Sequence, residues 1–377
     1  MAMTSPLFSS SVDLDAAQAH VYDVIVVGAG PAGSSAAYHL ADKGVDVLLL
    51  DRATFPRDKR CGDAVMPPAL AELALLGLAD EVGKRFAAVE RIGLWRKDLH
   101  VGYRPLDEGR GYVAPRVEFD ALLCEQALRR GAAWLDRVTI QEPVLEGTQV
   151  LLWGSRGSSP VKLRARLAIA ADGSGSRLAR GLMARASRQA DPAHSLTAPQ
   201  DDRARFTAMR GYFRGIEGLD DALEFYFRGE TGTFYYWIFP CGHGLANVGV
   251  IASMEQLRVG KTDLAKALSA FLQAPELLGR AAQAQIVGQW GAAPIATGLR
   301  GTALFGERFL CVGDAAALVD PHSAEGISGA LWSGRMAAET VADALSRNDF
   351  SLSSLSHYGS TVRARYLSLY DLLLRHS

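Results

Sequence analysis

The feature that most constrains the fold of this chain is a glycine-rich turn near its N-terminus. Residues 22–27 form a short apolar run, YDVIVV, residues 28–33 read GAGPAG, and a helical pattern follows. A second apolar run, VDVLLLD, occupies residues 45–51. Both runs are too apolar to be anything but buried parallel strands. The order strand, turn, helix, strand predicts an α/β protein with a Rossmann-type domain.

The turn has the GxGxxG pattern that binds dinucleotides. Gly28 allows the tight turn, Gly30 lets the backbone approach a pyrophosphate, and Gly33 allows the helix to pack closely on the strand. Pro31 and Ala32 lie within the turn and are further candidate cofactor contacts, and the amides at the start of the helix that follows are expected to hold phosphate groups. We therefore expect a dinucleotide at this turn.

Two residues at the end of the second strand extend the predicted site. Asp51 is placed to accept hydrogen bonds from ribose hydroxyls. Arg52 follows it and is a further candidate for cofactor binding. This fingerprint alone does not distinguish NAD from FAD.

Two later segments also end a strand with an aspartate beside a glycine. Asp172 follows the apolar run LAIAA, and Gly313-Asp314 follows FLCV. In open α/β sheets, ligands bind at the carboxyl ends of such strands. With the first motif, these segments resemble the three fingerprints of the FAD-dependent hydroxylase and reductase superfamily. In that superfamily the role of the residue matching Asp172 is partly structural.

This resemblance implies FAD as the cofactor, bound by a domain of the glutathione reductase-2-like type. The ribityl chain would contact Asp314, and the loop before the next helix would bring backbone donors to the pyrimidine end of the flavin. The implied contacts in this part of the chain are Gly313, Asp314, Pro321, Gly326 and Ile327. The chain has Ala324-Glu325-Gly326 where the superfamily usually has GEG, which is a departure within that loop.

Arg116 stands directly before an amphipathic helical pattern at residues 118–131. The superfamily often has an arginine here, near the flavin, so Arg116 is a candidate cofactor ligand. An ordinary surface arginine before a helix is the alternative interpretation.

Further motifs narrow the resemblance. Residues 57–64 read RDKRCGDA, residues 235–240 read YYWIFP and residues 246–250 read ANVGV. These segments resemble the geranylgeranyl reductase family of FAD-dependent oxidoreductases, and among its members the bacterial menaquinone reductase type. The resemblance covers roughly residues 21–345.

The resemblance to this family implies hydride transfer from reduced FAD to a C=C bond of a polyprenyl chain, in a geranylgeranyl lipid or a prenylquinone. An unactivated alkene has no carbonyl to polarise, so the protein must hold it against the flavin in a dry pocket. Strand alternation puts Tyr235, Trp237 and Phe239 on one face and Tyr236 and Ile238 on the other. By resemblance, Tyr235 and Trp237 face substrate or flavin as catalytic candidates. The alternative is that both belong to the sheet core.

Cys61 is a candidate proton donor on the flavin side. Its neighbours Lys59 and Arg60 are cationic, and cations lower the pKa of a thiol. Arg60 and Cys61 are also candidate cofactor contacts, and Gly62 is expected to let the backbone approach the flavin ring. The alternative for Cys61 is a small buried side chain beside a glycine turn.

Two other functions stay open. A flavin monooxygenase or halogenase of the same fold would act on a small or carrier-bound aromatic substrate, although halogenases have WxWxIP where this chain has YYWIFP. A flavin-bound lipid carrier without turnover is the third possibility. For a reductase, the electron donor would be NAD(P)H or a ferredoxin-type protein.

Composition limits the partners. The net charge of −1 offers no basic field for nucleic acid. The four cysteines form no CxxC pair and the histidines no ligand spacing, so neither a metal site nor a disulfide framework is predicted, and a reducing cytoplasm is expected. The N-terminus does not read as a signal peptide, and no apolar run is long enough for a membrane span. The expected partner is a hydrophobic lipid, with peripheral membrane contact through the last helix as one interpretation and packing on the protein as another.

The patterns also predict a domain organisation. Residues 1–20 are expected to be disordered, and the polar stretch around 185–205 to be a linker or mobile loop. The predicted parts are a discontinuous FAD-binding domain at 21–190 and 291–350, an inserted antiparallel β-sheet substrate domain at 191–290 to which 88–115 adds strands, and a C-terminal helix at 351–377.

Overall fold

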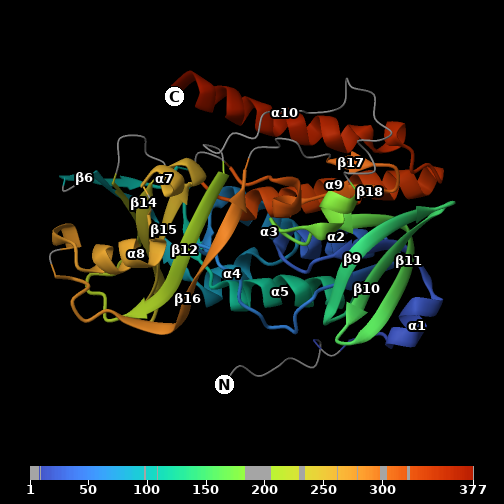
Figure 1. Cartoon of the computed structure of the whole chain (residues 1–377), viewed down its shortest axis with the longest axis horizontal. Coiled ribbons are helices and arrows are strands. Elements are labelled where there is room, and N and C mark those ends of the chain that lie inside the picture. The colour runs from blue at the N-terminus through green and yellow to red at the C-terminus, as the bar shows by residue number, and fades with distance from the viewer. Residues whose placement is uncertain are drawn as a thin grey trace. The chain divides into compact units, whose positions relative to one another are not determined.

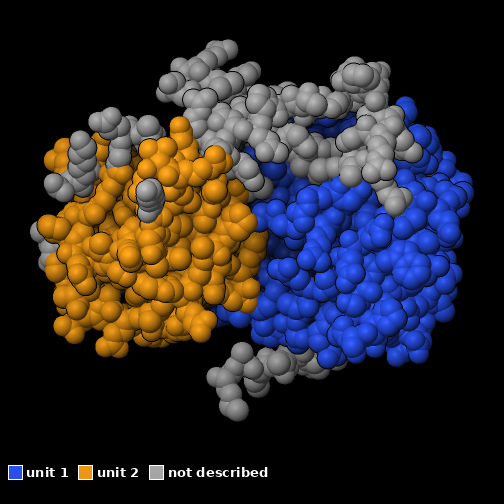
Figure 2. All heavy atoms as spheres, viewed as in Figure 1, with its two compact units in different colours: residues 1–57, 117–200, 296–377 blue, residues 58–116, 201–295 orange. Residues whose placement is uncertain are grey.

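The computed structural model describes residues 8, 10–96, 99–107, 109–182, 205–228, 234–260, 262–277, 279–297, 304–320 and 323–376. The chain divides into two compact units, coloured blue and orange in Figure 2. Unit 1 comprises residues 1–57, 117–200 and 296–377, and unit 2 comprises residues 58–116 and 201–295.

Unit 1 is built on an eight-stranded sheet whose main path runs β17-β18-β11-β1-β2-β8. Its centre is parallel, as predicted: β18 (Phe309–Cys311), β11 (Ser159–Ala170), β1 (Val21–Val27), β2 (Val47–Leu50) and β8 (Ala133–Leu135). The remaining strands pair antiparallel at its margins: β17 (Phe305–Gly306), β9 (Val138–Glu146) and β10 (Gln149–Arg156). The carboxyl-terminal parts of the central parallel strands, residues 24–27, 47–50 and 167–170, are apolar throughout because they are buried on both faces.

The helices of unit 1 cover this sheet. They include α1 (Leu14–Ala19), α2 (Pro31–Asp42), α5 (Arg116–Arg129), α9 (Ile327–Arg347) and α10 (Leu352–His376), with the short 3-10 helix η5 (Gly313–Ala316). Helices α2 and α9 pack tightly, since a Cβ at Gly334 would lie 2.3 Å from the carbonyl oxygen of Ala32. In Figure 1, α10 runs along α9. The buried Tyr358 and Tyr366 of α10 donate to the carbonyls of Cys311 and Leu318 at 2.6 and 2.8 Å, so this helix packs on unit 1.

The predicted disorder of residues 1–20 is wrong for Leu14–Ala19, which form α1. Asp13 caps this helix, because its carboxylate accepts the amides of Asp15 and Ala16 at 2.9 and 3.3 Å. Ala17 is fully buried. A cap and one small buried side chain are enough to order a short polar helix on an existing core, and neither produces an apolar run in the sequence.

Unit 2 is built on a seven-stranded sheet in the order β16-β12-β15-β14-β13-β5-β6. The strands are β16 (Gln285–Ala296), β12 (Arg205–Arg214), β15 (Leu245–Ser253), β14 (Tyr235–Gly242), β13 (Ala222–Phe227), β5 (Arg91–Arg96) and β6 (Leu99–Pro105). The registered pairs are antiparallel, as predicted, except that β5 and β13 are parallel.

A smaller three-stranded sheet in unit 2 joins β3 (Ala64–Val65), β7 (Gly111–Val113) and β4 (Ala87–Val89). The helical segments of this unit are α3 (Pro67–Leu75), α4 (Ala79–Arg85), α7 (Met254–Gly260), α8 (Leu264–Leu272) and the 3-10 turn η4 (Pro275–Leu277). Because β3 and β4 both pair with β7, residues 58–87 lie in unit 2 and not in the FAD-binding domain, where the sequence pattern predicted them. The predicted linker at 185–205 lies almost wholly outside the described residues.

The seven-stranded sheet has two different faces. On the helix face, Tyr236 and Ile238 of β14 share a core with Phe271 of α8. On the opposite face, which we call the aromatic face, Phe225, Tyr235, Trp237 and Phe239 form a row of ring contacts. The alternation predicted for residues 235–239 is therefore confirmed.

No helix in the described part of the chain is long and apolar enough to cross a membrane.

Candidate active site

The glycine turn of unit 1 is closely packed backbone. Gly28 has a φ of +107°, and a Cβ there would lie 2.3 Å from the carbonyl oxygen of Ala171. A Cβ at Gly33 would lie 1.8 Å from the carbonyl oxygen of Gly28. Gly30 is the N-cap of α2 and supplies no side-chain hydrogen bond to the first turn of the helix. The first amides of α2 thus receive no side-chain cap, and amides in this position favour phosphate.

Asp51 fastens this turn to the end of β2. It is 6% exposed, and its carboxylate accepts the amides of Ala29 at 3.0 Å and Ala53 at 2.9 Å. Arg57 lies 3.3 Å from Asp51 and 2.7 Å from Asp120, and so holds the two acids together. Arg52 is exposed.

The third motif lies against the same helix. Gly313 has a φ of +55°, and a Cβ there would lie 2.8 Å from the Cβ of Ala32 in α2. The amide of Gly313 donates to the hydroxyl of Ser333 at 3.0 Å. A Cβ at Gly326, the N-cap of α9, would lie 3.5 Å from Oδ1 of Asp314. Asp314, Gly326 and Ile327, the first residue of α9, are therefore neighbours in space, whereas Pro321 lies outside the described residues.

Glu325 is a member of this loop that sequence reasoning did not single out. Its Oε1 accepts the amide of Ser328 at 2.8 Å and so caps the first turn of α9. Burial raises the pKa of the Glu325 carboxyl. The protein itself thus satisfies part of this helix N-terminus.

Asp172 has a structural role in the turn after β11. Its carboxylate accepts the hydroxyl of Ser176 and the amides of Arg177 and Leu178, the amides at 3.1 and 3.5 Å. Burial raises the pKa of Asp172 even though these donors oppose the shift. A turn fixed in this way positions the backbone beside Gly28.

These features of unit 1 fit a flavin dinucleotide. The turn at Gly28 and Gly33 has no space for a side chain. Helices α2 and α9 both have a glycine at the N-cap position, so the N-cap residue itself supplies no side-chain hydrogen bond. The buried Asp51 directly follows β2. A pyrophosphate fits the N-terminus of α2, a ribose fits Asp51, and the ribityl chain fits the neighbourhood of Asp314.

In unit 2, residues 58–63 lie against the aromatic face of the sheet. Arg210 of β12 is 2% exposed and donates to the carboxylate of Asp58 at 2.5 Å and to the carbonyl oxygens of Lys59 and Cys61 at 3.0 and 3.3 Å. Asn247 of β15 donates to the carbonyl oxygen of Cys61 at 2.8 Å. One buried cation and one buried amide therefore fix the backbone of this segment.

Gly62 lies close to the rings of the aromatic face. A Cβ at Gly62 would lie 3.2 Å from the ring of Phe239 and 3.8 Å from Nε1 of Trp237. The indole N–H of Trp237 donates to Oδ1 of Asn247 at 2.9 Å, which fixes the orientation of the ring. Tyr235 is the next ring in the row, 6.4 Å from Trp237 between centroids. The structure thus brings together Gly62 and Trp237, with Cys61 and Tyr235 adjacent to them.

The predicted lowering of the Cys61 pKa is wrong. Burial raises the pKa of this thiol more than Arg116 and Lys59 lower it. The second expected cation, Arg60, is paired with Asp58 at 2.7 Å. Arg116, the first residue of α5, is buried rather than on the surface. Cys61 is therefore a neutral thiol, half-buried and accepting the amide of Asp63 at 3.3 Å.

Asp63 is the acid that sequence reasoning missed. It is 0% exposed and has a φ of +66°. Its Oδ2 accepts the Tyr212 hydroxyl at 2.5 Å and the Asn247 side-chain amide at 2.8 Å. Burial raises the pKa of Asp63 to about 7, although Arg210, Tyr212 and Asn247 all act to lower it. The signal in the sequence was weak: an aspartate two residues from the cysteine, with partners on two distant strands.

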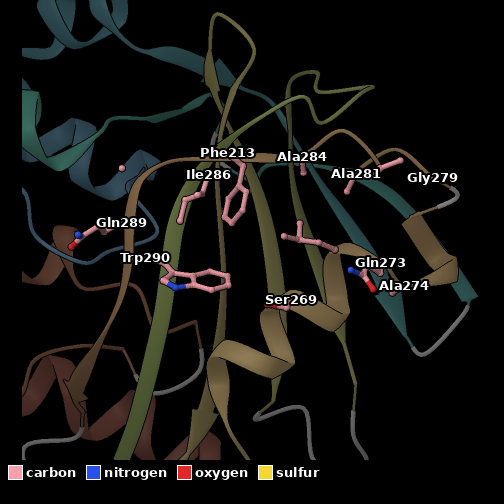
Figure 3. A pocket seen from close by; sticks show the side chains of 13 residues that line it. Phe213, Ser269, Gln273, Ala274, Gly279, Ala281, Ala284, Ile286, Gln289 and Trp290 are labelled. Atoms are coloured by element: carbon pink, nitrogen blue, oxygen red, sulfur yellow. The ribbon is translucent and has the colours of Figure 1, made fainter.

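A cavity of about 870 Å³ lies elsewhere in unit 2, between α8, the edge strand β16 and its neighbour β12. Figure 3 shows Phe213, Ile286 and Trp290 on one side of it, and on the other Ser269 of α8 and Gln273, the C-cap of that helix. Phe213 belongs to the helix-face core, so this cavity is not on the aromatic face. Among the residues that the structure describes, no group of His, Cys, Asp and Glu side chains is arranged to hold a metal ion.

Comparison with known proteins agrees with this architecture. A family model described as an FAD binding domain matches residues 21–215. Digeranylgeranylglycerophospholipid reductase 2 of Methanopyrus kandleri is 31% identical, over 89% of this chain and 81% of its own length. Menaquinone reductase of Mycobacterium tuberculosis is 33% identical, over 85% and 76%.

Solved structures give the same fold. A geranylgeranyl bacteriochlorophyll reductase-like protein from Thermoplasma acidophilum has a TM-score of 0.77 and 26% identity, over 92% of this chain and 84% of its own. The myxobacterial chondrochloren halogenase, at 23% identity and a TM-score of 0.78 over 94% and 82%, shows a similar fold only. The fold and the site define an FAD-dependent oxidoreductase. The chain belongs to the geranylgeranyl reductase family.

Proposed function

We propose that this protein reduces a C=C bond of a polyprenyl chain carried by a lipid or a quinone. The observation that carries the proposal is the aromatic face of unit 2, a row of four rings with residues 58–63 fixed against it. Of the two curated relatives reported above, one is named for a digeranylgeranyl phospholipid and the other for menaquinone. An apolar wall of this kind suits a hydrocarbon substrate with few polar groups to recognise.

FAD, when bound and reduced, supplies the hydride. The work of unit 1 is to bind it, with the turn at Gly28–Gly33 holding the pyrophosphate and Asp51 and Asp314 holding hydroxyls. The electron donor in this proposal is NAD(P)H or a ferredoxin-type protein.

The work of unit 2 is to position an alkene and exclude water. Trp237 presents a fixed ring because Asn247 holds its N–H and the absence of a side chain at Gly249 leaves room for it; a Cβ there would lie 2.1 Å from the indole. Tyr235 stays protonated, since burial raises its pKa. A rigid, neutral wall of this kind favours close approach of two apolar reactants and disfavours water.

The function is tested on the yellow holoprotein under anaerobic conditions. The flavin is reduced, and a geranylgeranyl lipid or a prenylquinone is added. Reoxidation of the flavin together with a lipid product heavier by two hydrogen atoms supports the proposal. A product heavier by one oxygen atom, formed under oxygen with NADPH, indicates a hydroxylase instead. No product from any polyprenyl compound, with the flavin staying reduced, overturns the proposed function.

A further inference from the structure

Asp63 is the most buried ionisable group beside the aromatic face. Its side chain is wholly inside unit 2, and its backbone carbonyl accepts the amide of Ala114 at 2.8 Å. The φ of +66° is a left-handed conformation that costs a residue with a side chain about 1–2 kcal/mol. The segment therefore keeps a strained backbone and a buried acid at one position, a combination that clusters at functional sites.

The two carboxyl oxygens of Asp63 have different surroundings. Oδ2 accepts from Tyr212 and Asn247. Oδ1 is buried and has no hydrogen-bond partner among the residues that the structure describes. A carboxylate with a bare buried oxygen is poorly stabilised, whereas a carboxylic acid with its proton on Oδ1 keeps both bonds at Oδ2. The geometry therefore fits the protonated acid, whose hydroxyl has no acceptor in the part of the chain that the structure describes.

We propose that Asp63 holds the proton that the reduction consumes, with Tyr212 and Asn247 as its positioning residues; this rests on the proposed function. Alkene reduction adds a hydride to one carbon and a proton to the other. Reduced flavin provides the hydride and both electrons and is oxidised, while the O–H bond of Asp63 breaks and the second C–H bond forms. Asp63 is left as a carboxylate and is reprotonated from water between turnovers.

Cys61 is less suited to this task. Its thiol pKa is raised above the ordinary value, so it releases a proton less readily than an ordinary thiol. A buried acid with a pKa of about 7 is matched to proton transfer near neutral pH. Cys61 instead contributes its carbonyl oxygen, which Asn247 and Arg210 use to hold the segment.

The charges around Asp63 come from several elements. Arg210 and Tyr212 of β12 and Arg116 at the start of α5 all act to lower its pKa, and burial outweighs them. Cys61 and, on β14, Cys241 are neutral thiols whose pKa the charge of Asp63 raises. Tyr212 is a permanent donor because burial and Asp63 raise its pKa far above neutrality. Among these described neighbours, Asp63 is the group that changes charge near pH 7.

The experiment measures flavin reoxidation by a polyprenyl substrate in single turnovers of the FAD-loaded protein across about pH 5 to 9. The wild-type rate is expected to fall as pH rises through about 7, because only the acid form gives a proton. Asp63→Asn is expected to lower the rate about 100-fold or more without changing apparent substrate affinity, and to abolish this dependence. Asp63→Glu should recover part of the rate.

Two further variants separate this role from a structural one. Tyr212→Phe removes a donor that lowers the Asp63 pKa, so the fall in rate should move to higher pH. In Cys61→Ala the rate should fall at the same pH as in the wild type. A structural role for Asp63 would change the rate in Asp63→Asn but would not produce a directed shift in Tyr212→Phe.

Infrared difference spectra between the wild type and Asp63→Asn give a readout that needs no substrate. The carboxylic acid band of Asp63 is expected below about pH 7 and should disappear above it. If the wild type reduces substrate but Asp63→Asn matches it in rate and pH profile, the inference is overturned and the proposed function stands. The inference is likewise overturned if the rate of Asp63→Asn still falls as pH rises through about 7, because the titrating group is then another one, such as the flavin. If the wild type reduces no polyprenyl compound, the proposed function itself fails.

Discussion

In unit 1 the site consists of positions where a side chain would collide, since Cβ atoms at Gly28, Gly33 and Gly313 would lie between 1.8 and 2.8 Å from neighbouring atoms. In unit 2 the site consists of side chains that collect around one loop, with Arg210, Tyr212 and Asn247 holding residues 58–63. The first is a shape made by backbone, and the second is a hydrogen-bonded network between distant strands.

This difference determines how each site can be damaged. A backbone cradle tolerates no added atoms, because neither its glycines nor the carbonyls opposite them can move without disturbing the parallel sheet. A side-chain network loses energy in steps, as each donor that is removed leaves a buried acceptor unpaired. Cofactor binding should therefore depend on the absence of side chains at the glycines of unit 1. Proton transfer should depend on the buried hydrogen-bond donors of unit 2.

The largest effect is expected from Gly28→Ala. The new methyl would lie 2.3 Å from the carbonyl oxygen of Ala171 in a backbone with φ +107°, so the protein should purify without FAD and lose more than about 3 kcal/mol of unfolding free energy. Flavin absorbance per chain and urea unfolding measure the two effects. The matched control is Gly44→Ala, at φ +74° with no atom within 4 Å, which should cost about 1 kcal/mol and keep FAD. Full FAD occupancy in Gly28→Ala would contradict the volume argument.

Arg210→Met tests the network of unit 2. The substitution keeps apolar bulk but leaves the carbonyls of Lys59 and Cys61 with one donor fewer, and should destabilise the protein by about 3 kcal/mol. Bound FAD should be retained below the unfolding transition. Arg214→Met on the same strand removes an exposed arginine that donates to the carbonyl of His243, and should change stability by less than about 0.5 kcal/mol. Equal losses of stability in the two variants would show that the buried hydrogen bonds of Arg210 stabilise the protein no more than the exposed hydrogen bond of Arg214.

The two sites also differ in how far sequence predicts them. The glycine turn, Asp51 and Asp314 are readable because each motif adjoins its own strand, so local order fixes their place in space. The neighbours of Cys61 in the chain, Lys59 and Arg60, suggested a lowered pKa. Burial and the pairing of Arg60 with Asp58 reversed the result, and neither is visible in local sequence.

Asp63 was missed for the same reason. Its two donors come from residues 212 and 247, which adjoin only because β12 pairs with β15, and Tyr212 is opposite Asn247 in that register. The sequence predicted an antiparallel sheet in this region but not the register of its strands. In the sequence, an aspartate next to a glycine is typical of an ordinary exposed turn, so the burial of Asp63 is not indicated by its neighbours.

The pH dependence of stability sharpens the claim about Asp63. Its pKa is raised from 3.8 unfolded to about 7 folded, so folding favours the protonated form; this stability is present below about pH 4 and is lost as pH rises through about 7. One pKa unit corresponds to about 1.4 kcal/mol, which puts the upper bound near 4 kcal/mol, and about 2 kcal/mol is expected after relaxation. Asp63→Asn stays neutral, so its melting temperature should rise relative to wild type between about pH 5 and pH 8. A difference that does not vary with pH would contradict the raised pKa.

The smallest effect is expected from Ala324→Gly in unit 1, where the chain has alanine in the loop before α9. Ala324 has a φ of +55°, so the alanine keeps a left-handed conformation that glycine adopts without strain. Relief of that strain, about 1–2 kcal/mol, is opposed by the greater freedom of glycine in the unfolded chain, about 0.4–1 kcal/mol. The variant should gain about 0.5 kcal/mol in urea unfolding and bind FAD unchanged, because the backbone that adjoins Asp314 stays where it is. A destabilised variant would mean that the alanine methyl makes packing contacts whose loss outweighs the relief of strain. Backbone conformation alone would then not account for the stability of the loop before α9.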